Sequence, residues 1–260
     1  MIAAYELGGT GPQVLLLHGG GGTADHWQEF AAHLDGFQVV AIDLPGHGAS
    51  SDSSWQWEDA LDELETLELD NPAVVGHSLG GMLAVRWGLR HPDCPGVVNL
   101  DGNGWPSTYP GLADAEAAAV RSNLSAVFKA QADAMAAALS PEQVEMLVAQ
   151  QPLIRRNLVT RDGQTFLRPE RPALDVIREL IERERTTSLY DGLRCPALAV
   201  VATKLFPAQE PFGDLLRAQQ RGVVKDLADR RVVEFDGSHG MLFEDPQGLA
   251  NLVAAFLTGA

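Results

Sequence analysis

The segment that most constrains this chain is a short apolar run that ends in a G-x-S-x-G pattern and passes directly into a helical pattern. The run is Ala73-Val74-Val75, the pattern is Gly76-His77-Ser78-Leu79-Gly80, and Gly81 follows. A serine at such a strand-to-helix turn is held in a strained backbone conformation with its hydroxyl exposed, and small neighbours let other backbone pass close by. A chance match in a glycine-rich loop is the alternative, but the flanking patterns favour a nucleophile elbow with Ser78 as the nucleophile.

Short apolar runs alternate with helical patterns along most of the chain. The runs predict strands at residues 14–17, 38–42, 73–75, 96–100, 197–201 and 231–235, and the helical patterns cover residues 24–34, 57–69, 79–90, 211–221 and 246–257. Runs that stay apolar without alternation are typical of strands buried on both faces of a parallel sheet. The sequence therefore predicts an α/β fold with a doubly wound, mostly parallel sheet.

The alternation stops between Trp105 and Tyr190, where the chain is rich in alanine and helical in character. Within this stretch, Ser140-Pro141-Glu142-Gln143 has the capping-box pattern that begins a helix, whereas residues 159–172 are expected to form a loop. We expect residues 105–190 to form a helical cap, or lid, inserted between two strands. Residues 1–104 and 191–260 are expected to form the core domain.

Composition excludes several classes of function. The chain has 19 Lys and Arg residues against 35 Asp and Glu residues, a formal net charge of −16, whereas nucleic-acid binding depends on clustered basic residues. No apolar run approaches the ~20 residues that span a bilayer, and we find no signal-peptide pattern. We therefore expect no nucleic-acid partner and no membrane partner. Two separated cysteines and an excess of arginine over lysine indicate a cytoplasmic, bacterial protein, either a monomer or a homodimer.

The acidic residues are unevenly distributed. Residues 1–104 hold 15 acidic residues against 2 basic ones, whereas residues 155–185 hold 8 arginines against 6 acidic residues. The acidic first part is expected to be a solvated face. We expect one of Arg155, Arg156 or Arg161 to face the substrate pocket, where it would meet a carboxylate-bearing substrate.

Three further segments, in chain order with the elbow, resemble the α/β-hydrolase family. Leu15-Leu16-Leu17-His18-Gly19-Gly20 resembles the family's first core strand and oxyanion loop, with Trp27 where the family often has an aromatic residue. Asp43-Leu44-Pro45-Gly46-His47-Gly48 resembles its D-x-P-G-H-G turn. Gly237-Ser238-His239-Gly240, followed by Glu244, resembles its catalytic-histidine loop. The resemblance covers nearly the whole chain and implies the α/β-hydrolase fold, which hosts many different chemistries.

The oxyanion hole and the base follow from these segments. Glycines 19–22 let backbone N–H groups turn toward the elbow, and we expect the N–H of Gly20, with Gly21 as a further candidate, to act with that of Leu79. A phosphate-binding loop is the alternative, but the lysine of a P-loop is missing. Among the seven histidines, His239 fits the chain order Ser, acid, His. His18 and His47 are expected to hold backbone hydrogen bonds.

The sequence departs from the family at the acid. Leu205 stands where the family usually has an aspartate after the strand at 197–201. We expect Asp101 to replace it, because Asp101 ends the strand beside the elbow strand and its carboxylate would face the same crevice. Glu210 is the alternative acid and Asp236 a third. A turn-forming Asp-Gly with no catalytic role, or a dyad without an acid, also stays open.

Together these residues predict a serine hydrolase that cleaves a carboxylic ester, lactone or thioester of a small apolar or aromatic molecule. Ser78 would form an acyl-enzyme, His239 would act as base and then acid, and Asp101 would orient His239; we expect no metal and no organic cofactor. The expected pocket residues are Trp27, Trp105, Tyr109, Phe206 and Met241. A C–C bond hydrolase, a hydroxynitrile-lyase-like enzyme and a ligand-binding receptor without turnover are the alternatives.

Overall fold

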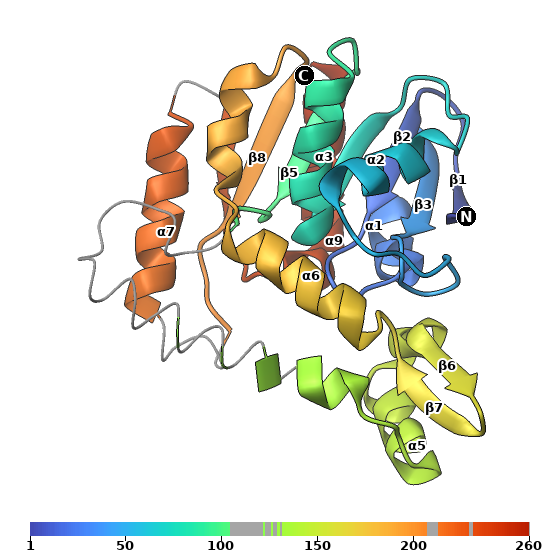
Figure 1. The fold of residues 1–260 in the computed structure, drawn as a ribbon. Coiled ribbons are helices and arrows are strands. Elements are labelled where there is room, and N and C mark those ends of the chain that lie inside the picture. Colours follow the sequence, from blue (N-terminus) through green and yellow to red (C-terminus); the bar gives the residue numbers. More distant parts are fainter. Residues whose placement is uncertain are drawn as a thin grey trace.

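A seven-stranded sheet forms the centre of the molecule, with its strands in the order β1-β3-β2-β4-β5-β8-β9 (Figure 1). The computed structural model describes residues 1–104, 122, 126, 129–130, 132–206, 213–228 and 231–259. The strands are β1 (Ala3–Gly8), β2 (Gln13–Leu17), β3 (Gln38–Asp43), β4 (Ala73–His77), β5 (Val97–Leu100), β8 (Ala197–Ala202) and β9 (Arg231–Phe235). Only the β1–β3 pair is antiparallel among these seven strands, so the expected mostly parallel sheet is confirmed.

The sheet feeds two apolar layers, because successive side chains of a strand point to opposite faces. Leu15 and Leu17 of β2 pack in a cluster with α2 (Trp57–Glu65), α3 (Leu79–Arg90) and α7 (Gly213–Asp226). Val14 and Leu16 of the same strand pack on the other face, against α1 (Gln28–Ala31) and α9 (Pro246–Thr258). Burial on both faces is the reason that the strand-forming runs show no polar alternation.

The segment inserted between β5 and β8 carries its own elements. They include α5 (Pro141–Gln150), the 3-10 helix η3 (Pro152–Asn157), β6 (Leu158–Arg161), β7 (Gln164–Leu167), α6 (Arg171–Glu182) and the 3-10 helix η4 (Thr186–Gly192). In Figure 1, α5 and the β6–β7 hairpin extend beyond the end of the sheet, at the lower right. The capping box of Ser140 and Gln143 is present at the start of α5. Where the core ends and a cap begins stays a prediction.

A hairpin and an edge strand were not expected from the sequence. Residues 159–172 are not a loop, because β6 and β7 pair there as an antiparallel hairpin. Its turn is Asp162-Gly163, with φ of 50° and 77°, a left-handed pair whose twist matches that of the flanking strands. The other element is β1, an edge strand in which half-buried and exposed residues alternate.

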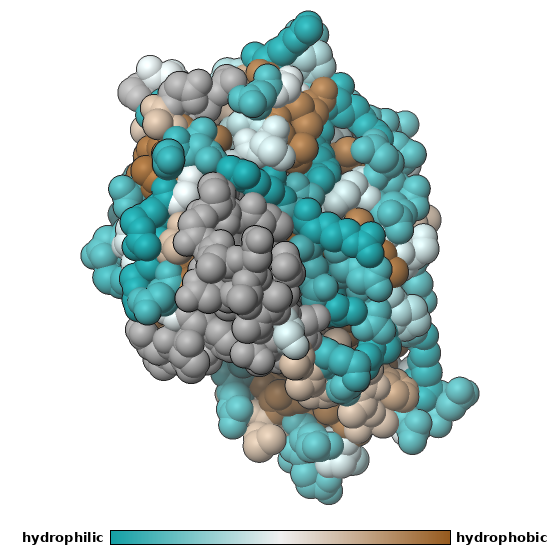
Figure 2. Space-filling view, turned by 60° about the vertical axis from the view of Figure 1, so that its left-hand side comes forward, coloured by the Kyte–Doolittle hydropathy of each residue, from teal (hydrophilic) through white to brown (hydrophobic). Residues whose placement is uncertain are grey.

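Ion pairs join the inserted segment to the acidic core. Arg156 pairs with Asp25, Arg161 and Arg168 both pair with Asp52, and Glu184 pairs with Arg86 of α3. In the view of Figure 2, hydrophilic side chains cover most of the described surface and apolar side chains are exposed in small patches. Among the described helices, none combines the length and the apolarity needed to cross a bilayer.

Helix α3 begins in very close contact with the strands beside it, and two glycines make this possible. A Cβ atom on Gly76 would lie 2.0 Å from the carbonyl oxygen of Gly80, and one on Gly80 would lie 2.2 Å from that of Leu17. Backbone atoms form both obstacles, so no side chain can rotate away to make room.

Alanine at Gly76 is expected to lower the free energy of unfolding by about 3 kcal/mol or more, because it overpacks immobile backbone. Gly20→Ala is the matched control: its Cβ would meet only Leu79 Cδ2, at 3.9 Å, so its effect should stay near ~0.5 kcal/mol. Urea unfolding of both variants measures the difference. Wild-type stability in Gly76→Ala would contradict this packing.

Candidate active site

Ser78 lies between β4 and α3 in a strained backbone conformation, with φ 53° and ψ −116°. A non-glycine residue in this region costs about 1–3 kcal/mol and persists only where surrounding contacts hold it. Here the N–H of Ser78 donates to the carbonyl of Leu100 (2.9 Å), and its own carbonyl accepts from the N–H of Met82 (3.1 Å). Ser78 is partly exposed whereas His77 and Leu79 are buried, which is the geometry expected of a nucleophile elbow.

Asp101 and His239 are hydrogen-bonded, with 2.7 Å between Oδ2 of Asp101 and Nδ1 of His239. The other carboxylate oxygen accepts from the side-chain amide of Asn103 (3.0 Å) and from the N–H of Ala202 (3.2 Å). A carboxylate of this kind fixes the imidazole as a donor at Nδ1, which leaves Nε2 as the nitrogen that can accept a proton.

Asn99 of β5 shapes the turn that presents Asp101. Its side chain accepts from the N–H of Gly102 (2.8 Å) and donates to the carbonyl of Gly102 (3.0 Å), and it is bonded to the hydroxyl of Tyr190 (3.2 Å). Asp101 has a φ of 55°, a left-handed conformation that Asp tolerates better than most residues. This local network aims the carboxylate toward His239.

The pKa of His239 results from two opposing effects. Burial disfavours the charged imidazolium and would lower the pKa, but the hydrogen bond and the negative charge of Asp101 outweigh burial and raise it above the ordinary value. His77 behaves differently, since burial lowers its pKa to about 3. Neutral His77 donates from Nε2 to the carbonyl of His239 (2.8 Å), so it supports the loop of His239 and is not placed as a base.

A second carboxylate holds the loop of His239. Glu244 in α8 (Met241–Glu244) accepts from the N–H of Ser238 (2.8 Å) and from its hydroxyl (2.5 Å). These hydrogen bonds lower the pKa of Glu244. Asp236, the third candidate acid, is exposed and pairs with Lys204 at 2.9 Å. The structure therefore brings Asp101, and not Asp236, to the histidine.

The oxyanion loop presents Gly20 on its exposed side. The N–H of Gly21 donates to Nε2 of His47 (3.1 Å), and that of Gly22 donates to the carbonyl of Gly19 (2.9 Å). The N–H groups of Gly21 and Gly22 are therefore already hydrogen-bonded. Gly20 is the loop's candidate for the N–H donor that acts with Leu79 on the oxyanion. Leu79 is the first residue of α3, where N–H groups have no partner within the helix. The loop lies against the elbow, since a Cβ on Gly19 would meet Cβ of Ser78 at 3.2 Å.

Two neutral histidines hold the loops around Gly20, as expected. His18 donates from Nδ1 to the carbonyl of Gly19 (2.7 Å) and accepts at Nε2 from the N–H of Leu44 (2.9 Å). His47 donates from Nδ1 to the carbonyl of Pro45 (2.9 Å). Burial lowers the pKa of His47 to about 4 and that of His18 well below its usual range.

Asp43, the first residue of the D-x-P-G-H-G turn, is completely buried. Its two oxygens accept from the N–H groups of Ala24 and Ala49, each at 2.8 Å, and the hydroxyl of Tyr5 donates to it at 3.2 Å. These donors satisfy a buried carboxylate that would otherwise be costly. A Cβ on Gly48 would lie 2.1 Å from Asp43 Oδ2, so the turn folds directly over this carboxylate.

The residues expected to line the pocket differ in their burial. Trp27 and Met241 are completely buried in the apolar layer that also contains Phe30. Phe206 is 38% exposed and lies against Gly240, beside His239, so it is the described candidate for a pocket wall. Trp105, Tyr109 and Glu210 lie outside the described residues.

Two of the three arginines of which one was expected to face the substrate pocket form ion pairs elsewhere in the protein. Arg156 pairs with Asp25 and lies over the ring of Tyr5, and Arg161 pairs with Asp52 and Glu170. Both guanidinium groups therefore serve contacts within the protein, and Arg155 is exposed. Within the described part of the chain, no group of three or more His, Cys, Asp or Glu side chains is arranged to hold a metal ion.

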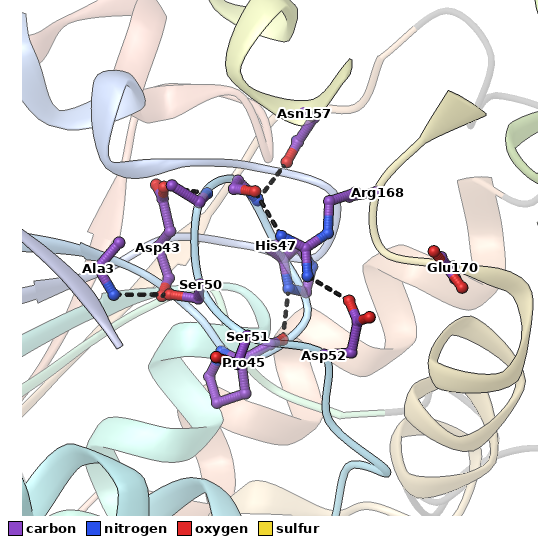
Figure 3. A network of polar contacts seen from close by, with 12 residues as sticks. Ala3, Asp43, Pro45, His47, Ser50, Ser51, Asp52, Asn157, Arg168 and Glu170 are labelled. Atoms are coloured by element: carbon purple, nitrogen blue, oxygen red, sulfur yellow. Dashed lines mark hydrogen bonds and ion pairs between the residues drawn. The ribbon is translucent and has the colours of Figure 1, made fainter. Parts of the chain in front are cut away.

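Asn99, Asn157 and Arg168 are among the residues of the site that were not foreseen from the sequence. Asn99 carries a weak signal, because it is a polar residue inside the apolar run Val97-Val98-Asn99-Leu100. Asn157 and Arg168 contact the loops around Gly20 and His47 (Figure 3). No local pattern indicates them, because their partners are far away in the sequence.

Comparison with known proteins identifies the family. A family model described as "Alpha/beta hydrolase family" matches residues 14–252. The chain belongs to the alpha/beta hydrolase family. It is 30% identical to pimeloyl-(acyl-carrier protein) methyl ester esterase of Chromobacterium violaceum, over 96% of this chain and 95% of that one. It is 38% identical to an esterase of Mycobacterium tuberculosis over 38% of this chain, which corresponds to only 35% of that protein.

Solved structures agree on the fold. The crystal structure of E-2-(acetamidomethylene)succinate hydrolase matches 99% of this chain and 95% of its own, with a TM-score of 0.71 and 20% identity.

In the present chain, β8 does not carry the acid but supports it through a backbone hydrogen bond. Leu205 stands where the family usually has the acid, and β8 instead donates the N–H of Ala202 to Asp101, the residue that follows β5.

Replacing Asp101 by asparagine is expected to lower kcat by about 10⁴-fold, because the wrong histidine tautomer is then stabilised. The wild-type kcat/KM should rise with pH through the raised pKa of His239, since the base must be neutral. In Asp101→Asn this acid limb should move to lower pH, because the charge that raises the pKa is gone.

Steady-state kinetics from pH 5 to 9 test this expectation. Asp236→Asn is the control, because it removes an acid from the loop that carries His239 without contacting the His239 side chain. The pH profile of this variant should match that of the wild type. Near-normal turnover in Asp101→Asn would instead point to Glu210.

Proposed function

We propose that the chain is a serine hydrolase that cleaves a carboxylic ester, lactone or thioester of a small apolar or aromatic molecule. The observation that carries the proposal is the 2.7 Å hydrogen bond between Asp101 and His239. Asp101 follows β5 at the same carboxyl edge of the sheet as the strained, partly exposed Ser78, which follows the parallel neighbour β4. The pairing of an oriented imidazole with a serine at an elbow is the chemistry of acyl transfer.

The proposed reaction has two stages. In the first, His239 Nε2 takes the proton of Ser78 as Oγ bonds to the substrate carbonyl carbon, and the N–H groups of Gly20 and Leu79 receive the negative oxygen. The bond to the leaving alkoxide or thiolate then breaks, and His239 returns the proton to that group. In the second stage, water attacks the acyl-enzyme with His239 again as base, releasing the acid and restoring Ser78.

Two of the relatives favour an ester over a C–C bond or a cyanohydrin as the bond that is cleaved. The Chromobacterium violaceum protein is named a methyl ester esterase and the Mycobacterium tuberculosis protein an esterase. Phe206, whose partly exposed ring lies against Gly240 in the loop of His239, supports a small apolar or aromatic substrate.

A fluorophosphonate probe should label Ser78, and the protein should hydrolyse short aryl esters such as p-nitrophenyl acetate and butyrate. Ser78→Ala should abolish labelling, and its hydrolysis should fall to the rate of the residual background. Mass spectrometry locates the label, and release of p-nitrophenol measures turnover. Labelling of wild type without turnover on any ester would contradict the hydrolase proposal and favour the lyase or the receptor.

A further inference from the structure

Asn157, at the end of η3 in the inserted segment, joins two loops of the core. Its side-chain oxygen accepts from the N–H of Gly48 (2.7 Å), and its amide nitrogen donates to the carbonyls of Gly21 (2.7 Å) and Gly22 (3.1 Å). The side chain is 2% exposed. Its contact with Gly21 spans 136 residues of sequence, so only the folded inserted segment can supply it.

Arg168 holds the other side of the same turn. Its guanidinium donates to the carbonyl of Gly48 and to Asp52, each at 2.5 Å. The N–H of Arg168 also donates to the carbonyl of Asn157 (2.8 Å), which closes the base of the β6–β7 hairpin. Figure 3 shows Asn157 and Arg168 reaching the turn around His47 from the inserted segment. The two residues that flank the hairpin thus bind both the N–H and the carbonyl of Gly48.

Gly21 is consequently fixed at both of its polar groups. Its N–H donates to His47, and its carbonyl accepts from Asn157. Four consecutive glycines have an unusually large conformational freedom, and Gly21 has a φ of 76°, a region that no side chain of its own would stabilise. The direction of the neighbouring Gly20 N–H therefore depends on contacts made from outside the loop.

We propose that Asn157 is a positioning residue for the oxyanion hole, which holds Gly21 and Gly22 so that the N–H of Gly20 faces the reacting carbonyl. The inference rests on the proposed hydrolase function. It makes the inserted segment part of the catalytic apparatus, although the described contacts of Asn157 are with loop backbone and not with Ser78, Asp101 or His239. An amide is required, because the site needs one acceptor for Gly48 and one donor for two carbonyls.

Asn157→Asp is the sharpest variant, since it keeps the size and the acceptor but turns a carboxylate oxygen toward two carbonyls. Asn157→Ala removes both functions and serves as the second variant. The control is Arg161→Gln, which removes an ion pair of the same hairpin with Asp52 but touches no glycine of the loop. It leaves the pair between Arg168 and Asp52 in place.

For both Asn157 variants, kcat on p-nitrophenyl acetate should fall by about 10- to 100-fold, as a displaced oxyanion donor predicts. KM should change far less. A trifluoromethyl ketone, which mimics the tetrahedral intermediate, should lose affinity by the same factor as kcat/KM, whereas the product carboxylate should bind as before. Arg161→Gln should match wild type in all four measurements.

Two readouts separate positioning from general destabilisation and from failure of the hydrolase proposal. Fluorophosphonate titration counts competent sites, so a variant that merely unfolds loses sites rather than rate per site. Hydrogen exchange of the peptide covering residues 18–26 needs no turnover, and it should accelerate in the Asn157 variants but not in Arg161→Gln. If exchange is faster in the Asn157 variants but the wild-type protein has no esterase activity, Asn157 still positions the loop and the hydrolase proposal is overturned. Unchanged exchange together with unchanged kcat per site would overturn the positioning role.

Discussion

The loops at the carboxyl edge of the sheet depend on one buried carboxylate. Asp43 ends β3 and accepts backbone N–H groups from Ala24, just beyond the oxyanion loop, and from Ala49, just beyond the D-x-P-G-H-G turn. A buried charge of this kind must be met by donors, so the two loops fold around it together. The end of β3 therefore fixes both the oxyanion loop and the turn at His47. The residues that flank the β6–β7 hairpin bind that same turn.

Much of the fold and the centre of the site could be predicted, because their determinants are local. The six predicted strands are present, with ends that differ by at most two residues, since burial on both faces leaves a continuous apolar run in the sequence. Ser78 is identified by the pattern around it. Asp101 could be proposed as the partner of His239 because the strands that precede them, β5 and β9, end at the same carboxyl edge of the sheet.

The contacts that could not be predicted are those without a local pattern. Asn157 and Arg168 look like ordinary polar residues in the sequence, and their partners lie more than a hundred residues earlier. The excess of acidic residues in the first part of the chain gives only a general indication that the arginine-containing inserted segment packs against it. Its ion pairs with the inserted segment are mostly partly exposed, and such pairs contribute little each, whereas the buried amide of Asn157 fixes a definite geometry.

The position of the acid on β5 has a consequence for how this protein can diverge. Ala202 supports Asp101 through its backbone alone, so the proposed proton transfer does not depend on the side chain of Leu205, which stands where the family usually has the acid. Leu205 can therefore be exchanged for another residue while Ser78, Asp101 and His239 keep their places. In evolutionary terms, a position that usually carries the acid has been released from that role.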